Sequence, residues 1–226
     1  MTNRLLLTAF LLLAACSSCV LPGASLASSP GASTQDEATV LIKVLCMDPY
    51  TGDPHVHMGS GLLVPGGVLT AAHVATCRAL DPLGQTIGSA PASAMVVSIG
   101  DTAAEGETVI LLPELDVALM KISGKSADTL RLNAVSPRIG PRPDVGDRIC
   151  ATAALPERSF RCGEVQVSGE TGEILTDLYV RHGNSGGPAF VNGALVGLVV
   201  TTTVCQDGHY CVGGVAPLQG LDWLVR

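Results

Sequence analysis

Short apolar runs separated by turn residues recur along this chain, and they constrain its fold more than any other feature. Almost no long stretch has helical periodicity, and the one helix that we expect is short and terminal, over residues 218–226. Many short strands at regular spacing indicate a β-sandwich or a β-barrel. The ten clearest strand-like runs cover residues 39–46, 59–64, 66–71, 94–100, 116–122, 148–155, 163–169, 173–180, 193–200 and 211–218.

A proline-rich stretch, "SPRIGPRPDVGD" (136–147), divides these runs into two groups of similar size. A chain of 226 residues is long enough for two small lobes, and 47% hydrophobic residues are enough for packed cores. We therefore predict an all-β protein of two β-barrel lobes, the first over about 38–130 and the second over about 145–226. Because aromatic residues are only 3% of the chain, the cores must consist mainly of Val, Leu, Ile and Ala.

The first residues have the pattern of an export signal. Arg4 precedes "LLLTAFLLLAA" (5–15), which is too short to span a bilayer as a mature helix. The "LAAC" that ends at Cys16 resembles a bacterial lipobox, which implies cleavage before Cys16 and lipid attachment to its sulfur. The alternative is an ordinary secretory signal that is cut after Ala27. Both interpretations predict export from the cytoplasm.

Residues 17–37 are rich in Ser, Ala, Gly and Pro, and they have no periodic pattern. Such a composition is typical of a flexible tether. We therefore predict three parts: a signal peptide with a candidate lipobox (1–16), a tether (17–37) and one folded domain (38–226).

The charge of the chain argues against a polyanionic partner. Thirteen Lys and Arg against twenty Asp and Glu give a net charge of −7, and no basic cluster is present. Nucleic acid is therefore disfavoured as a ligand. Membrane contact is expected through the lipid anchor only.

Six of the eight cysteines lie in the folded part, an even number that indicates disulfides in an exported chain. Neighbours in sequence predict the bonds Cys150–Cys162 and Cys205–Cys211, which leaves Cys46–Cys77 as the third. A zinc site is the alternative, but the folded part has no Cys-x-x-Cys spacing to favour it. Cys19 has no partner if Cys16 carries lipid.

One hydroxyl stands among residues of unusual backbone freedom in "GNSGGP" (183–188). A serine becomes a nucleophile when a base takes its proton and when backbone N–H groups receive the oxyanion. Glycines allow the sharp geometry that this needs, and they would let Ser185 lie exposed. The alternative is a plain surface turn, for which these residue types are also typical.

Two further stretches supply the other groups that a serine hydrolase needs. "TAAH" ends at His73, and "DVALMK" begins at Asp116. In the order His73, Asp116, Ser185, these three motifs resemble the catalytic signatures of the trypsin-like (chymotrypsin-fold) serine proteases. The resemblance extends over about residues 40–224.

The resemblance implies two antiparallel six-stranded β-barrels with the active site between them. Ser185 would attack a peptide carbonyl, His73 would act as general base and then as general acid, and Asp116 would orient His73. The N–H groups of Gly183 and Ser185 would form the oxyanion hole. The protein would thus be a serine endopeptidase that acts on protein or peptide substrates through an acyl-enzyme intermediate, without a cofactor.

The resemblance also indicates the substrate pocket. Tyr179 stands where enzymes that cut after Lys or Arg carry an acid, so we expect a small or medium uncharged side chain before the cleaved bond. The further expected pocket residues are Val200, Thr201, Thr202 and Gly214. We expect no metal site, because the histidines of "HVH" (55–57) belong to a Gly- and Pro-containing loop in which solvated side chains are the rule.

Two alternatives concern function. "GNSGG" also fits the nucleophile elbow of the α/β-hydrolases, but there the acid and the histidine follow the serine, and no alternating strand–helix pattern precedes Ser185. A catalytically silent, surface-tethered binding protein on the same fold is the second alternative, although all three triad residues are present. "GNSGGP" is similar to exported bacterial proteases of the high-temperature-requirement group, which often carry PDZ domains. No such module is expected in a chain that ends at Arg226.

Overall fold

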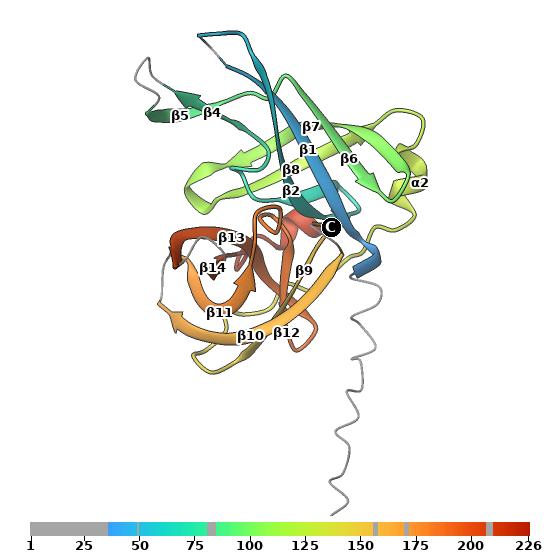
Figure 1. Cartoon of the computed structure of the whole chain (residues 1–226). Coiled ribbons are helices and arrows are strands. Elements are labelled where there is room, and N and C mark those ends of the chain that lie inside the picture. Colours follow the sequence, from blue (N-terminus) through green and yellow to red (C-terminus); the bar gives the residue numbers. More distant parts are fainter. Residues whose placement is uncertain (1–35, 49, 81–84, 156–157, 170–171, 207–209) are drawn as a thin grey trace, which may run out of the picture.

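Two β-barrels make up the protein in a computed structural model, which describes residues 36–48, 50–80, 85–155, 158–169, 172–206 and 210–226. Figure 1 shows one barrel above the other, the first in blue to green and the second in yellow to red. Each barrel is closed and has six strands. All strand pairs within the barrels are antiparallel. The predicted fold class is therefore confirmed.

The first barrel has the strand order β1-β2-β3-β8-β7-β6. A separate hairpin of β4 and β5 projects from it (Figure 1). The strands are β1 (Thr39–Met47), β2 (Pro54–Val64), β3 (Gly67–Thr70), β4 (Cys77–Leu80), β5 (Thr86–Ala90), β6 (Ala94–Ile99), β7 (Thr102–Leu112) and β8 (Val117–Ser123). Two short helices flank β8, the 3₁₀ turn η1 (Pro113–Leu115) and α2 (Ala127–Arg131).

The second barrel has the strand order β10-β11-β14-β13-β12-β9. Its strands are β9 (Arg148–Ala153), β10 (Ser159–Ser168), β11 (Ile174–Val180), β12 (Pro188–Val191), β13 (Ala194–Gln206) and β14 (Tyr210–Pro217). The proline-rich stretch 136–147 connects the barrels, and its Gly140 N–H donates to the Leu195 carbonyl at 2.9 Å. This stretch therefore runs along the second barrel before β9 begins.

Buried and exposed side chains alternate along the strands that surround each core. In β1, Val40, Ile42 and Val44 are fully buried while Lys43 between them is exposed, as expected when successive side chains point to opposite faces. The end of β2 departs from this pattern, because all six residues of 59–64 are buried. One face of this segment packs into the first barrel, and hydrogen bonds from Ser60 join it to the second barrel. A continuous run of buried residues thus marks the boundary between the barrels.

The C-terminal segment joins the core of the first barrel. Leu224 and Val225 are buried in the same hydrophobic cluster as the side chains of β1, β2 and β8. The predicted helix over 218–226 is present only as a 3₁₀ turn, η2 (Asp222–Val225). The helical segment is short because Leu218 and Leu224 are both buried in this core. Their packing, rather than helix propensity, determines the conformation of the chain here.

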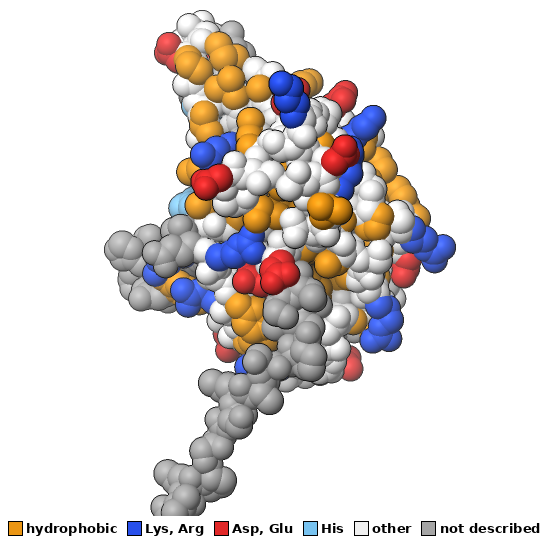
Figure 2. All heavy atoms as spheres, turned by 90° about the vertical axis from the view of Figure 1, so that its right-hand side faces the viewer, with side chains coloured by type: hydrophobic (Ala, Val, Ile, Leu, Met, Phe, Trp, Pro, Cys, Tyr) orange, Lys and Arg blue, Asp and Glu red, His pale blue; other side chains and the backbone are white. Residues whose placement is uncertain are grey.

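Charged side chains are scattered over the surface. On the face shown in Figure 2, Lys and Arg are interspersed with Asp and Glu, and no broad patch of one sign stands out. None of the helices in the described part of the chain has the length and apolar character that a membrane span requires.

Candidate active site

His73 lies in a tight turn that follows β3. The N–H groups of Val74 and Ala75 donate to the Ala71 carbonyl at 3.1 and 3.3 Å, so the chain makes one helical turn here. Ala71, Ala72, Val74 and Ala75 are buried, whereas the His73 side chain is 48% exposed. Small apolar residues therefore anchor the turn in the first barrel and present one imidazole ring outward.

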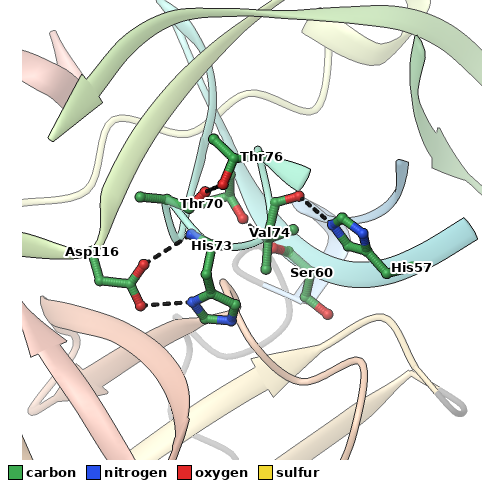
Figure 3. A network of polar contacts seen from close by, with 8 residues as sticks. His57, Ser60, Thr70, His73, Val74, Thr76 and Asp116 are labelled. Atoms are coloured by element: carbon green, nitrogen blue, oxygen red, sulfur yellow. Dashed lines mark hydrogen bonds and ion pairs between the residues drawn. The ribbon is translucent and has the colours of Figure 1, made fainter. Parts of the chain in front are cut away.

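Asp116 holds His73 by two hydrogen bonds (Figure 3). The backbone N–H of His73 donates to Oδ1 at 2.9 Å, and Nδ1 of the ring lies 2.7 Å from Oδ2. Because an ionised carboxylate only accepts hydrogen bonds, the neutral ring must carry its proton on Nδ1. Nε2 then keeps its lone pair and can accept a proton from another group.

The backbone of Asp116 is held in an unusual conformation. Its φ of 50° lies in the left-handed region, and among the described non-glycine residues only Asn192 shares this property. Asp tolerates this region better than most residues, and its N–H donates to the Pro113 carbonyl at 3.1 Å to close η1. The backbone of a non-glycine residue in this conformation is strained, and such strain is often found at functional sites. Here it directs the carboxylate onto the turn of His73.

The turn around Ser185 is held by the neighbouring Asn184. The Arg181 N–H donates to Oδ1 of Asn184 at 2.6 Å, and Nδ2 of Asn184 donates to the Leu155 carbonyl at 2.6 Å. The turn also uses two left-handed glycines, Gly183 with φ 92° and Gly186 with φ 82°. A Cβ atom at Gly186 would collide with Thr70 Oγ1 and the Ser60 carbonyl. The glycine at this position is therefore required by both backbone conformation and space.

Ser185 as a whole residue is only 6% exposed, so the prediction that it lies exposed is wrong. The cause is packing against the first barrel, because the Ser60 N–H donates to the Ser185 carbonyl at 2.7 Å. The N–H of Gly183, one of the two expected oxyanion donors, has no hydrogen-bond acceptor among the described residues. The next N–H groups, those of Asn184, Gly186 and Gly187, all donate within the protein.

Ser60 of β2 links the two barrels at this turn, a role that the sequence analysis did not predict. Its hydroxyl donates to the Gly183 carbonyl at 2.7 Å and accepts from the Ala154 N–H at 2.9 Å. Its carbonyl accepts from the Thr70 hydroxyl at 2.7 Å. Ser60 is fully buried, so each of these polar groups needs its partner. The only local signal is a serine between two glycines in an otherwise apolar run, "GSGLLV".

Gly59 shows how close the turn of His73 comes to the turn of Ser185. A Cβ atom at Gly59 would lie 2.5 and 2.7 Å from the two methyl carbons of Val74 and 3.0 Å from the Ser185 carbonyl oxygen. Val74 directly follows His73. The residue after the candidate base and the candidate nucleophile therefore both pack on the same glycine. This contact places the turn of His73 and the turn of Ser185 at one junction between the barrels.

His57 supports the His73 turn from the other side (Figure 3). Its Nε2 lies 3.0 Å from the Val74 carbonyl, and its Nδ1 lies 3.6 Å from the Cys46 sulfur. Since a carbonyl only accepts, Nε2 carries the proton. Burial lowers the pKa of His57, and the nearby His55, His73 and Arg78 lower it further. The prediction of a solvated loop is wrong for this residue, which is partly buried on β2.

Two disulfides are present between described side chains. Cys46–Cys77 joins β1 to the end of the His73 turn, and Cys150–Cys162 joins β9 to β10. The backbones of Cys205 and Cys211 are paired across β13 and β14, but their side chains lie outside the described residues. Cys16 lies outside them as well. In the described part of the chain, no three His, Cys, Asp or Glu residues come together as metal ligands.

A small pocket lies beside the turn of Ser185, and Tyr179 contributes to its wall. Val200 is buried in the same hydrophobic cluster as Leu224 and Val225, and Gly214 pairs with it on β14. The side chains of Thr201 and Thr202 are outside the described residues. The pocket is lined by Ala151, Thr152, Ala153, Ser159, Arg161, Leu178, Tyr179, Val180, Asn184 and Val199.

Comparison with known proteins assigns the family. The model of a family described as "Trypsin-like peptidase domain" matches residues 59–198, more than half of the chain. The chain belongs to this family. The match begins at Gly59 and includes His73, Asp116 and Ser185, so the trypsin-like peptidase domain contains all three residues that the sequence motifs identified.

Among solved structures, the trypsin-like domain is similar to one described as "HtrA-type protease AlgW with tripeptide". The two are 20% identical, with a TM-score of 0.62, over 85% of this chain and 60% of that chain. At this identity the likeness shows the fold. The chain thus spans about three fifths of the length of that protein. A comparison with curated protein sequences gives no match.

Proposed function

We propose that the protein is a serine endopeptidase, with Ser185 as nucleophile, His73 as base and Asp116 as the residue that orients the base. The observation that carries this proposal is the double hydrogen bond from His73 to Asp116. It fixes the ring and its tautomer, so that the free lone pair on Nε2 is available for the serine proton. Family membership supports the same chemistry.

The reaction follows from these roles. Ser185 Oγ attacks the peptide carbonyl carbon while His73 Nε2 takes its proton, and the carbonyl oxygen becomes an oxyanion. The N–H groups of Gly183 and Ser185 donate to that oxyanion. His73 then gives the proton to the leaving amine, and the acyl-enzyme ester remains. Water, activated by the same histidine, hydrolyses the ester and frees Ser185.

The geometry of the Ser185 turn supports this assignment without a charged partner. Asn184 is uncharged, and both of its side-chain groups are already bonded, to the Arg181 N–H and the Leu155 carbonyl. A buried ammonium beside it would lack a counter-charge. We infer that the turn is ordered by these neutral hydrogen bonds, with no need for a newly cut N-terminus to insert.

The test is hydrolysis of a protein such as casein and of fluorogenic peptides by the purified protein. Ser185→Ala and His73→Ala are each expected to lower turnover about a millionfold. Asp116→Asn is expected to lower it about ten-thousand-fold, because the amide NH₂ would favour the wrong imidazole tautomer. Ser89→Ala, at an exposed position on β5, is the control and keeps the native rate.

The alternative of a catalytically silent binding protein makes a different prediction in the same experiment. It predicts that peptide is bound without cleavage and that Ser185→Ala changes nothing. Hydrolysis that persists at the native rate in pure Ser185→Ala would equally contradict the assignment of the nucleophile.

We further propose that the protein is exported and held at the membrane by lipid on Cys16, with residues 17–37 as the tether of the protease domain (38–226). The two disulfides support export, because such bonds persist in oxidising compartments. Cys16→Ser is expected to accumulate as an uncut, lipid-free precursor. A mature N-terminus at Ser28 would instead favour an ordinary signal peptide cut after Ala27.

A further inference from the structure

Two arginines lie over one aromatic ring beside the candidate nucleophile. The guanidinium carbons of Arg161 and Arg181 lie 5.1 and 5.0 Å from the centre of the Tyr179 ring. Nε of Arg181 also donates to the Tyr179 hydroxyl at 2.9 Å. We call Arg161 and Arg181 the arginine pair.

Strand alternation explains why this pair lies on the outside of the second barrel. Leu178 and Val180 of β11 are buried in the barrel core, so Tyr179 between them faces outward. β10 is the neighbour of β11 in the barrel, and it brings Arg161 onto the ring from the side. Residues from two strands thus converge although they are far apart in sequence.

The charges of the pair are not neutralised within the described part of the protein. Neither arginine forms an ion pair with a described residue, since the ion pairs there are His73–Asp116 and Arg131–Asp128. Two like charges held on one ring repel each other. An anion between or beside them would remove this repulsion and would gain charge-assisted hydrogen bonds from guanidinium groups.

The position of the pair connects it to the site of cleavage. The backbone N–H of Arg181 bonds to Asn184, which directly precedes Ser185. Arg161, Tyr179 and Asn184 also line the same small pocket, together with the hydroxyl-bearing Ser159. An anion bound here would therefore lie next to the turn that carries the nucleophile.

We propose that the arginine pair binds the acidic side chain of a peptide substrate, and that the enzyme favours Glu or Asp before the bond that it cuts. This inference rests on the proposed function as a serine endopeptidase. A single side-chain carboxylate needs only the two guanidinium groups as partners, whereas a polyanion is disfavoured by the net charge of −7. Tyr179 alone predicts an uncharged side chain. The two arginines that the fold places on its ring change that expectation to an acidic one.

The test compares two fluorogenic peptides that differ only in Glu or Gln before the cleaved bond. Gln has nearly the shape of Glu and lacks its charge, so the ratio of the two kcat/KM values measures recognition of the carboxylate. We expect a ratio of at least about tenfold in favour of Glu, since sites built for a polar group discriminate strongly against analogues that lack it. The ratio should fall as salt is raised, because the arginines are exposed to solvent.

The matched variants are Arg161→Gln with Arg181→Gln, and Arg148→Gln as control. Arg148 is an exposed arginine of β9 that neither lines the pocket nor lies over the ring. The double variant should lower the Glu/Gln ratio to about one, and the control should leave the ratio unchanged. Rates are expressed per active site labelled by a fluorophosphonate, so that loss of folded protein does not change the ratio. Arg161→Gln alone replaces the double variant if that one does not fold.

Two results would overturn the inference while leaving the proposed function intact. One is cleavage of both peptides at equal kcat/KM by the native protein. The other is a preference for Glu that the Arg161→Gln variants retain in full. If no peptide is cleaved and Ser185 takes no label, the proposed function fails, and this inference fails with it.

Discussion

Gly59→Ala tests the junction at which the two catalytic turns meet. The added Cβ would lie 2.5 and 2.7 Å from the Val74 methyl carbons and 3.0 Å from the Ser185 carbonyl oxygen. Carbon atoms pack at about 3.5–4.0 Å, so each methyl must move by about 1 Å. Val74 is 2% exposed and has little free space around it. We therefore expect the His73 turn and the Ser185 turn to be pushed apart.

The size of the effect follows from that displacement. Overpacking of a close-packed interior costs about 1–3 kcal/mol of unfolding free energy. A misplacement of about 1 Å in a catalytic constellation costs about a hundredfold in rate. We expect kcat/KM to fall about a hundredfold while the protein still folds. The loss of activity should thus exceed what the loss of folded protein explains.

The assay is peptide hydrolysis together with chemical denaturation, on Gly59→Ala and on the control Gly66→Ala. At Gly66 the added Cβ would meet Leu119 at 3.6 Å, an ordinary contact, so this variant should remain active and stable. Adding Val74→Ala to Gly59→Ala removes both clashing methyls, and the double variant should lose less than the two single variants together. A Gly59→Ala protein with native rate and stability would contradict this prediction.

Three further predictions follow from the hydrogen bonds of the site. Asn184→Ala leaves the partly buried Leu155 carbonyl and the Arg181 N–H without their partner, and denaturation should show a total loss of about 1–3 kcal/mol; a change under about 0.5 kcal/mol would contradict this. Because the folded state lowers the pKa of His57 below 6.5, its contribution to stability is present above about pH 6.5 and is lost as the pH falls through the folded-state pKa. The free energy of unfolding should therefore decrease less between roughly pH 7.5 and 5 in His57→Gln than in the native protein, and equal slopes would argue against this role. Proteins that begin at Ser17 and at Asp36 should cleave the same peptide equally fast per active site, since the Arg158 guanidinium already holds the Asp36 and Thr39 carbonyls in the uncut chain; a long form that stays silent until it is cut would contradict this.

The sequence predicts the strands best where their side chains alternate around a core. β1 and β11 begin and end within a residue of the runs that predict them, because each has one apolar face. The strand-like runs do not include β7, since its first half, "TAAEGE", contains charges and a glycine. Ala104 is buried, but the other side chains of β7 alternate between partly buried and exposed. β12 was missed because its four residues directly follow the glycines of the Ser185 turn.

The motifs identify His73, Asp116 and Ser185, but not the residues that hold them in place. Ser60 bonds to Gly183, 123 positions away, and His57 bonds to the carbonyl of Val74. Both partners are backbone groups, so no residue type in the sequence indicates the pairing. The burial of Ser185 has the same origin, because it depends on the contact between two barrels rather than on the glycines beside the serine.

The proposed function requires Ser185 to be a nucleophile that His73 activates. The most direct measurement is labelling with a fluorophosphonate, followed by mass spectrometry of the labelled peptide. We expect one label per protein on Ser185 at neutral pH, and strongly reduced labelling in His73→Ala. No label on folded native protein, or a label on another serine, would contradict it.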